Sequence, residues 1–250
     1  MAKTGTLDWM EATYGKLGLG DRLRLIGQGV RARAATRKRL RNNIRFRHME
    51  VDDILPPDSA IAREAMALCE AVSEPFLFNH CMRSWFWARL LDDGSGPLDE
   101  EVLFTGMMLH DLGLTERFGL RGQSMRCFTL PGARMAEELA AKHDWPGARA
   151  RLMAQAITLH LNVEIESRHG REAELMRAGS GGDVAGLGLD VLHADQIEAV
   201  CHKHPRLHMK REIAPVLQAE ADARPGCRIH FLINTFGFDG LIARAPMFSE

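Results

Sequence analysis

The sequence predicts an all-α fold, because of its composition and the spacing of its apolar residues. Aromatic residues make up only 6% of the 250 residues and there is a single tyrosine, whereas the helix-favouring residues Ala, Leu, Arg and Glu are abundant. Over several long segments, apolar residues recur at helical spacing, and residues that typically open helices precede them. Strand-like and helix-like segments do not alternate, which disfavours an α/β fold. With 46% hydrophobic residues, the chain can bury a packed core.

The N-terminal part differs from the rest, and we predict a basic extension over residues 1–55 and the main domain over 56–250. Ten basic residues and no acid lie between Arg22 and Arg47. Such a run is typical of a helix or arm with a solvated basic face, and the alternatives are a contact with nucleic acid, anionic lipid or an acidic partner. No nucleic-acid-binding motif accompanies it. Pro56 cannot continue a helix, and Asp58 or Ser59 can cap the next one.

Within the main domain, the pattern predicts helices joined by short loops. Ser73 is a plausible N-cap with Pro75 in the following first turn, and Asp99 opens a later helix. The glycine-rich stretch 178–190 is expected to be a loop. The tail 227–238 fits either a strand or a helix. The segments expected to be helical are 61–72, 75–91, 98–114, 130–145, 146–163, 193–205 and 207–223.

Charge and cysteine content limit the partners that we expect. The formal net charge is −1, so neither nucleic acid nor a membrane is an expected partner of the whole chain, while association between copies stays open. The five cysteines are scattered without a CxxC pair, which argues against a disulfide framework and a thiolate zinc site. A reducing, cytoplasmic location fits best. We find no apolar leader and no apolar window of about 18 residues, the length of a membrane span.

His110 and Asp111 stand side by side inside an apolar run, "GMMLHDLGLT". Burying two such polar groups is costly unless something satisfies them. A divalent metal ion would do so, because imidazole and carboxylate are ligands for such ions, but the pair cannot complete a site alone. His80, on the preceding predicted helix, is the first further candidate.

The last ligand is expected to be an aspartate, and three compete. Asp190 lies between Leu189 and Val191, where a carboxylate without a partner would be costly, so we predict that it is the ligand. Asp183 sits among glycines, where an Asx turn is expected. Asp195 follows the start of a helix and is expected to be exposed.

His160 lies at the C-terminal end of an apolar helix, where it could bind a second ion, position substrate or carry protons. His143 repeats the dipeptide with Asp144, but at a predicted helix end, and we expect it at the surface. Arg83 and Arg126 are the nearest basic candidates for binding an anionic group.

The ordered set His80, His110–Asp111 and Asp190 resembles the HD superfamily of all-α metal-dependent hydrolases. The segments "FNHCMRSWFWA", "LHDLGLTERF", "AITLH", "GLDV" and "HPR" resemble its cyanamide-hydratase-like branch in the same order. The resemblance runs from about Phe76 to Arg206. It implies an HD-domain helical bundle and metal-assisted addition of water to a C≡N group.

On this resemblance we expect one divalent ion, zinc first and iron or manganese as alternatives, on His80, His110, Asp111 and Asp190. Asp111, with His160 or Thr115, would orient water and relay protons, and a small-molecule substrate would bind near Asn79, Arg83 and Phe118. The phosphohydrolase branches often carry an acid soon after the His-Asp pair, whereas this chain has Leu112, Gly113 and Leu114.

Three other hypotheses about the function stay open at this point. A nucleotide phosphohydrolase is favoured by Arg83 and by its frequency in the superfamily. A di-iron oxygenase would need His143 and His160 as further ligands. A non-catalytic binding protein would use the basic extension.

Overall fold

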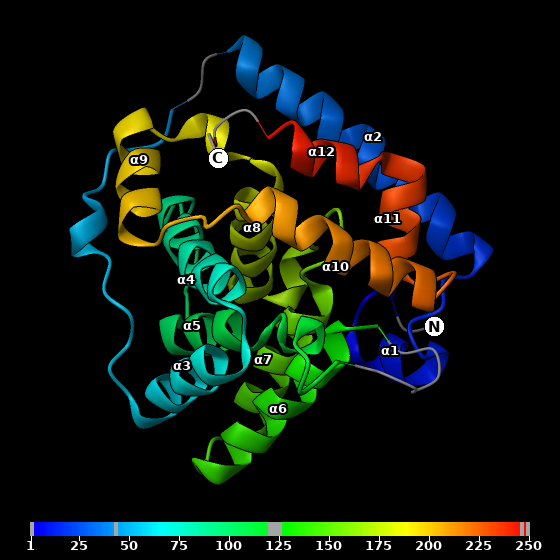
Figure 1. Ribbon diagram of the computed structural model, residues 1–250, viewed down its shortest axis with the longest axis horizontal. Coiled ribbons are helices and arrows are strands. Elements are labelled where there is room, and N and C mark those ends of the chain that lie inside the picture. The colour runs from blue at the N-terminus through cyan, green and yellow to red at the C-terminus, as the bar shows by residue number, and fades with distance from the viewer. Residues whose placement is uncertain (1–2, 43–44, 120–126, 246–247, 249–250) are drawn as a thin grey trace.

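The computed structural model describes residues 3–42, 45–119, 127–245 and 248, and all regular structure in those ranges is helical (Figure 1). The prediction of an all-α fold is confirmed. The α-helices are α1 (Leu7–Thr13), α2 (Leu19–Arg41), α3 (Ala60–Val72), α4 (Pro75–Leu90), α5 (Glu100–Leu109), α6 (Thr129–Lys142), α7 (Gly147–Leu159), α8 (Arg171–Ala185), α9 (Ala194–Lys203), α10 (Met209–Ala223), α11 (Arg228–Phe236) and α12 (Phe238–Ala243). Short 3₁₀ turns are η1 (Val51–Asp53), η2 (Leu112–Leu114), η3 (Ser167–His169) and η4 (Leu189–Val191).

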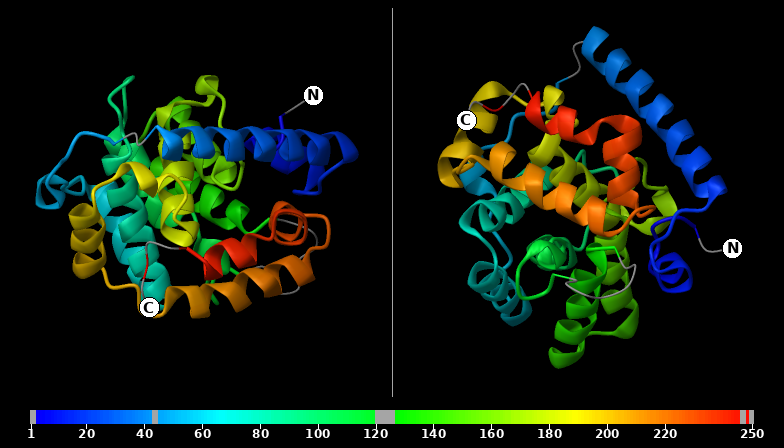
Figure 2. Two further views of the ribbon diagram at one scale, coloured as in Figure 1. Left: turned by 90° about the horizontal axis from the view of Figure 1, so that it is seen from above. Right: turned by 45° about the vertical axis from the view of Figure 1, so that its right-hand side comes forward.

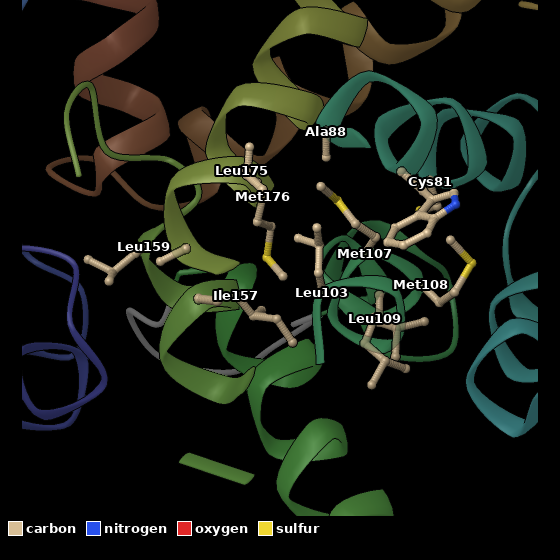
Figure 3. Packing of buried hydrophobic residues seen from close by; sticks show 14 of the residues in the cluster. Cys81, Ala88, Leu103, Met107, Met108, Leu109, Ile157, Leu159, Leu175 and Met176 are labelled. Carbon is tan, nitrogen blue, oxygen red and sulfur yellow. The ribbon is translucent and has the colours of Figure 1, made fainter. Parts of the chain in front are cut away.

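The centre of the bundle is formed by α4, α5, α7 and α8. Helix α4 packs along α8, and α5 packs against α3, α4 and α7. Helix α5 is apolar on all sides, as expected for a helix with neighbours all round. Figure 3 shows its residues Met107, Met108 and Leu109 among side chains from the surrounding helices, such as Cys81 and Ile157. The polar pair that follows α5 therefore enters the most buried part of the molecule.

The predicted helix starts are confirmed at two places and wrong at one. The Ser59 hydroxyl accepts from Ala62 N at 3.3 Å, and the Asp99 carboxylate accepts from Val102 N at 3.1 Å, so both cap their helices. Ser73 does not open α4, because it ends α3, and Pro75 occupies the first position of α4 after Glu74.

The predicted loop over residues 178–190 is wrong over most of its length, because α8 continues to Ala185. A Cβ atom built at Gly179 would lie 2.2 Å from Ser84 O, so only glycine lets the backbones of α8 and α4 approach this closely. The glycines predict a loop by their low helix propensity, but close helix packing overrides that propensity here. Helix α8 ends at Gly186, whose positive φ of 69° suits glycine.

The N-terminal extension lies against the bundle rather than apart from it. Helix α2 runs along the outer edge of the molecule (Figures 1 and 2), and its residue Gly29 faces the ring of Phe236 at the end of α11. Arg31 forms an ion pair with Glu164 at 2.7 Å, and Arg39 forms one with Asp190 at 3.2 Å. Its division from the main domain at residue 55 stays a prediction. For the tail, the helical alternative is correct. In the described part of the chain, we find no helix with the length and apolar character to cross a bilayer.

Candidate metal centre

His110 is the residue at which α5 ends, and Asp111 follows before the turn η2. Both are buried. Nδ1 of His110 lies 2.8 Å from the carbonyl oxygen of Met107, one turn earlier in α5. Because a carbonyl only accepts, Nδ1 carries the proton and Nε2 is left with a lone pair. The end of the helix thus fixes both the orientation and the tautomer of this imidazole.

His80 comes from the middle of α4 and faces the same point. Its Nδ1 lies 2.8 Å from Oδ2 of Asp183, and its Nε2 lies 3.2 Å from Nε2 of His110. Oδ2 of Asp111 is 3.3 Å from Nε2 of His80 and 3.4 Å from Nε2 of His110. Three ligand atoms from α4 and the end of α5 therefore converge.

His160 ends α7 in the same way that His110 ends α5. Its Nδ1 lies 2.7 Å from the carbonyl oxygen of Ile157, which leaves Nε2 free to accept. That Nε2 is 3.7 Å from Oδ1 of Asp111, and the His160 ring stands edge-on to the His110 ring at 4.9 Å. A fourth polar group thus borders the cluster.

The donor set fits a divalent cation. Two imidazole Nε2 atoms facing each other at 3.2 Å would repel unless a cation or a proton lay between them. Oδ1 of Asp111 is buried and has no hydrogen-bond partner within the described residues, which is costly for a carboxylate. Nitrogen and oxygen donors suit zinc, iron or manganese. His80, His110 and Asp111 form the one cluster of potential metal ligands found among the described residues.

The pKa values of the cluster follow from burial and from neighbouring charges. Burial alone would lower the pKa of His80, but Asp111 and Asp183 outweigh it and raise that pKa to about 9. Burial, and then the neighbouring His110, lowers the pKa of His160 to about 3, and burial also lowers the pKa of His110. Burial would raise the pKa of Asp111, yet the surrounding imidazoles hold it well below its ordinary range.

Asp183 supports His80 from behind. Its carboxylate is fully buried and accepts from His80 Nδ1, from Arg83 at 2.7 and 2.9 Å, and from Trp87 Nε1 at 2.8 Å. Arg206 adds a longer bond at 3.4 Å. Burial would raise the pKa of Asp183, but Arg83 and His80 hold it well below its usual range. Such a carboxylate–histidine pair fixes the ring of a metal ligand and raises its basicity.

The structure does not bring Asp190 to this cluster. Asp190 lies in η4, where its carboxylate accepts from Arg39 of α2 at 3.2 and 3.4 Å. The prediction that Asp190 is the last ligand is therefore corrected. The ion pair with Arg39 offsets the cost of burying its carboxylate. The Asx turn predicted for Asp183 is wrong, because this residue lies inside α8 and not in a loop. Asp195 is at the start of α9 and pairs with His48, in keeping with its expected exposure.

The predicted substrate residues Asn79 and Arg83 are directed elsewhere. Arg83 is fully buried on Asp183 and on the carbonyl oxygens of residues 204 and 205, and Asn79 donates to Pro205 O at 2.8 Å. Phe118 is half-buried and packs against the hydrophobic core, so its role in substrate binding stays a prediction. Arg126 lies outside the described residues.

Thr115, predicted as a relay, holds the turn after Asp111. Its hydroxyl donates to Leu112 O at 2.7 Å and accepts from Phe118 N at 3.3 Å. Its place in proton transfer stays a prediction. His143, predicted at the surface, is partly exposed at the end of α6 and pairs with Glu64 at 2.9 Å.

A signal for Asp183 was present in the sequence. His80, Arg83 and Trp87 follow one another at spacings of three and four residues, so they share a face of α4. A buried face that carries a guanidinium and two ring N–H donors requires an acceptor, and the small residues of α8 allow one to come close.

Comparison with known proteins agrees with this geometry. The family model described as HD domain matches residues 77–212, which is more than half of the chain. The chain is also similar to the cyanamide hydratases DDI2 and DDI3 of Saccharomyces cerevisiae. Identity to each is 24% over 201 residues, covering 74% of this chain and 87% of each relative. The chain therefore belongs to the HD domain family and is a metal-dependent enzyme of the hydrolase or hydratase kind, similar to its cyanamide-hydratase-like branch.

Proposed function

We propose that this protein is a hydratase that adds water across the C≡N bond of a small neutral substrate such as cyanamide. The observation that carries the proposal is that three histidines, His80, His110 and His160, direct their Nε2 atoms toward the Asp111 carboxylate in an apolar setting. His80, His110 and Asp111 would hold one divalent ion, for which we propose zinc. Such an ion, when bound, lowers the pKa of a water ligand and polarises a carbon–nitrogen multiple bond.

Asp111 and His160 would have different roles in the reaction, the first in orienting water and the second in proton transfer. Oδ1 of Asp111 has no hydrogen-bond partner in the described structure and would accept a bond from the attacking water, which orients it. His160 is uncharged at neutral pH and offers Nε2 as an acceptor 3.7 Å from that oxygen. It would take one proton from the water and return it to the substrate nitrogen. A C–O bond forms, one π bond of the C≡N group is lost, and tautomerisation gives the amide or urea.

The surroundings support a neutral substrate over a phosphate ester. The residues after Asp111 are Leu112, Gly113 and Leu114, so no acid follows the His-Asp pair directly. Arg83, the basic residue on which the nucleotide phosphohydrolase hypothesis depends, donates to both carboxylate oxygens of Asp183 instead. A di-iron centre is also poorly supported, because it needs His143, which pairs with Glu64 instead.

Elemental analysis of the purified chain, together with His110→Ala and His160→Ala, tests the proposal first. We expect about one divalent ion per chain, lost in His110→Ala and retained in His160→Ala. Two irons per chain would contradict the proposal in favour of the oxygenase. Loss of the ion in His160→Ala would make His160 a fourth ligand rather than the proton acceptor.

Activity is then compared on cyanamide, small nitriles and a panel of nucleotides. We expect turnover of a C≡N substrate, lowered in His160→Ala by about 10²- to 10⁴-fold, the usual contribution of a positioned acid–base group. Hydrolysis of nucleotides with no action on cyanamide or nitriles would favour the phosphohydrolase instead.

A further inference from the structure

Helix α2 presents an outward face that nothing in the described molecule covers. Leu19, Leu23, Ile26 and Val30 recur at spacings of four, three and four residues, which places them on one side of the helix. Their exposed fractions are 76%, 61%, 40% and 62%. Single exposed aliphatic residues are common, but four in one row form a contiguous apolar stripe.

Basic residues continue this face toward the C-terminal end of α2. Arg37 and Arg41 follow at the same helical spacing and are exposed, whereas the exposed Arg33 places its guanidinium over the Phe236 ring, at 5.9 Å from the ring centroid. None of them forms an ion pair among the described residues. In total, α2 carries eight basic residues and one acid, although the whole chain has a net charge of −1. Positive charge is therefore concentrated on this helix.

Helix α2 contacts the bundle through a few residues on its inner side, and its outward face makes none of these contacts. Leu25, Gln28 and Gly29 are buried. A Cβ atom at Gly29 would lie 2.6 Å from the Phe236 ring, which shows how closely α2 lies on α11. Figure 2 shows α2 at the periphery of the molecule in both views. The apolar stripe and the outward arginines thus lie on a peripheral helix.

We propose that this outward face of α2 docks on an anionic lipid surface. A surface-bound amphipathic helix inserts apolar side chains among the acyl chains, while its arginines bind lipid phosphates. Because the aliphatic half of α2 precedes the basic half, α2 would lie inclined to the surface, with its N-terminal half deeper and its C-terminal arginines at the phosphates. The contact is peripheral and requires no membrane-spanning segment.

Other occupants match this face less well. A second copy of α2 packed antiparallel along its full length would set the aliphatic half against the arginine half, and a parallel copy would set arginine against arginine, which is repulsive. Nucleic acid would satisfy the arginines but would leave four aliphatic side chains against phosphates, and the face has no aromatic residue for stacking on bases.

Vesicle co-sedimentation of the full-length protein tests the proposal. The vesicles are phosphatidylcholine alone and phosphatidylcholine with about 30% phosphatidylserine, chosen to give the surface potential of an anionic leaflet. We expect binding to the anionic vesicles only, weakened by added salt. Each arginine or lysine near such a surface contributes about fivefold in partitioning. The triple variant Arg37→Gln/Lys38→Gln/Arg41→Gln should therefore bind about a hundredfold more weakly.

A second variant, Leu23→Ser/Val30→Ser, tests the apolar stripe and should also lose binding, because buried apolar area is part of the affinity. The matched controls are Arg63→Gln/Arg151→Gln/Arg211→Gln, which removes the same charge from other surfaces, and Leu55→Ser, an exposed aliphatic residue outside α2. The controls should bind like the wild type. Circular dichroism and metal content confirm that each variant is folded.

Several results would overturn the proposal. Absence of binding to anionic vesicles by the folded wild type would do so directly, and so would equal losses in the controls. Binding of a homopolymeric RNA that competes with the vesicles and is lost in the arginine variant alone would favour nucleic acid. A concentration-dependent dimer that Leu23→Ser/Val30→Ser abolishes, without vesicle binding, would assign the face to a second copy.

Discussion

The chain contains the dipeptide His-Asp twice, and the two copies have the same local position but different surroundings. His110 ends α5 and His143 ends α6. His110 is fully buried, with its Nε2 facing His80 and Asp111, whereas the His143 side chain is 20% exposed and pairs with Glu64. Asp144 is exposed and Asp111 is buried. Both copies therefore lie at a helix end, and the helices packed around His110 and Asp111 are what distinguish the candidate metal centre.

The largest effect should separate the two histidines directly. His110→Ala removes a ligand, so we expect loss of the ion and a fall in kcat/KM of at least about 10³-fold, equivalent to several kcal/mol of lost metal catalysis. His143→Ala should keep the ion and activity within about twofold, because a surface ion pair contributes little. Elemental analysis and steady-state kinetics check both variants. Equal losses would show that burial does not distinguish the two copies.

The next effect concerns the carboxylate behind the buried copy. Asp183→Asn leaves Arg83 without its counter-ion, so we expect a loss of about 3–5 kcal/mol in the free energy of unfolding. Metal affinity should fall about 10- to 100-fold, because His80 loses its orienting partner. Asp190→Asn, which breaks a partly exposed pair with Arg39, should cost less than about 1 kcal/mol. Urea unfolding at neutral pH and metal titration measure these differences, and a larger loss at Asp190 would reverse our assignment.

A smaller effect is expected from the packing that brings Asp183 to His80. In Gly179→Ala the new methyl group would lie 2.2 Å from Ser84 O, so α8 must move, at a cost of about 1–3 kcal/mol. Gly181→Ala is the control on the same helix, since its methyl group meets only the Leu187 side chain, with Cδ1 at 3.4 Å and Cβ at 3.9 Å. There we expect a gain of up to about 1 kcal/mol from helix propensity. Thermal unfolding distinguishes the two, and a stabilised Gly179→Ala would contradict the close approach of α4 and α8.

The smallest expected effect is the number of protons released when the metal ion binds. Without metal, the pKa of His80 is about 9, so it is protonated at pH 7, while the lowered pKa values leave His110 and His160 neutral and Asp111 charged. An ion that takes Nε2 of His80 must displace that proton. We expect release of about one proton per ion at pH 7, falling toward zero as the pH rises above 9. Calorimetry in buffers of different ionisation enthalpy measures the count, and release that does not fall with pH would contradict the assignment to His80.

The all-α fold and most of the candidate metal centre could be predicted from the sequence, because both depend on local signals. Apolar spacing and capping residues located the helices, and His80, His110 and Asp111 were identified from residue type and order. Asp183 could not be identified in the same way. Its selection over Asp190 depends on how closely α8 approaches α4 and on which carboxylate an arginine from α2 neutralises. These are contacts between segments far apart in the sequence, and local propensity does not encode them.

His110 and His160 are oriented in the same way, each by the end of its own helix. Each ring is held by a carbonyl oxygen one turn back in its own helix, so neither depends on the other for its direction. The distance between the two rings then depends on how far apart α5 and α7 are held. Gly106 of α5 faces α7 closely, since a methyl group on it would lie 3.6 Å from Met153 and 3.8 Å from Ile157, both of α7. The distance from His110, a proposed metal ligand, to His160, the proposed proton acceptor, is accordingly set by hydrophobic packing one layer away from the two rings.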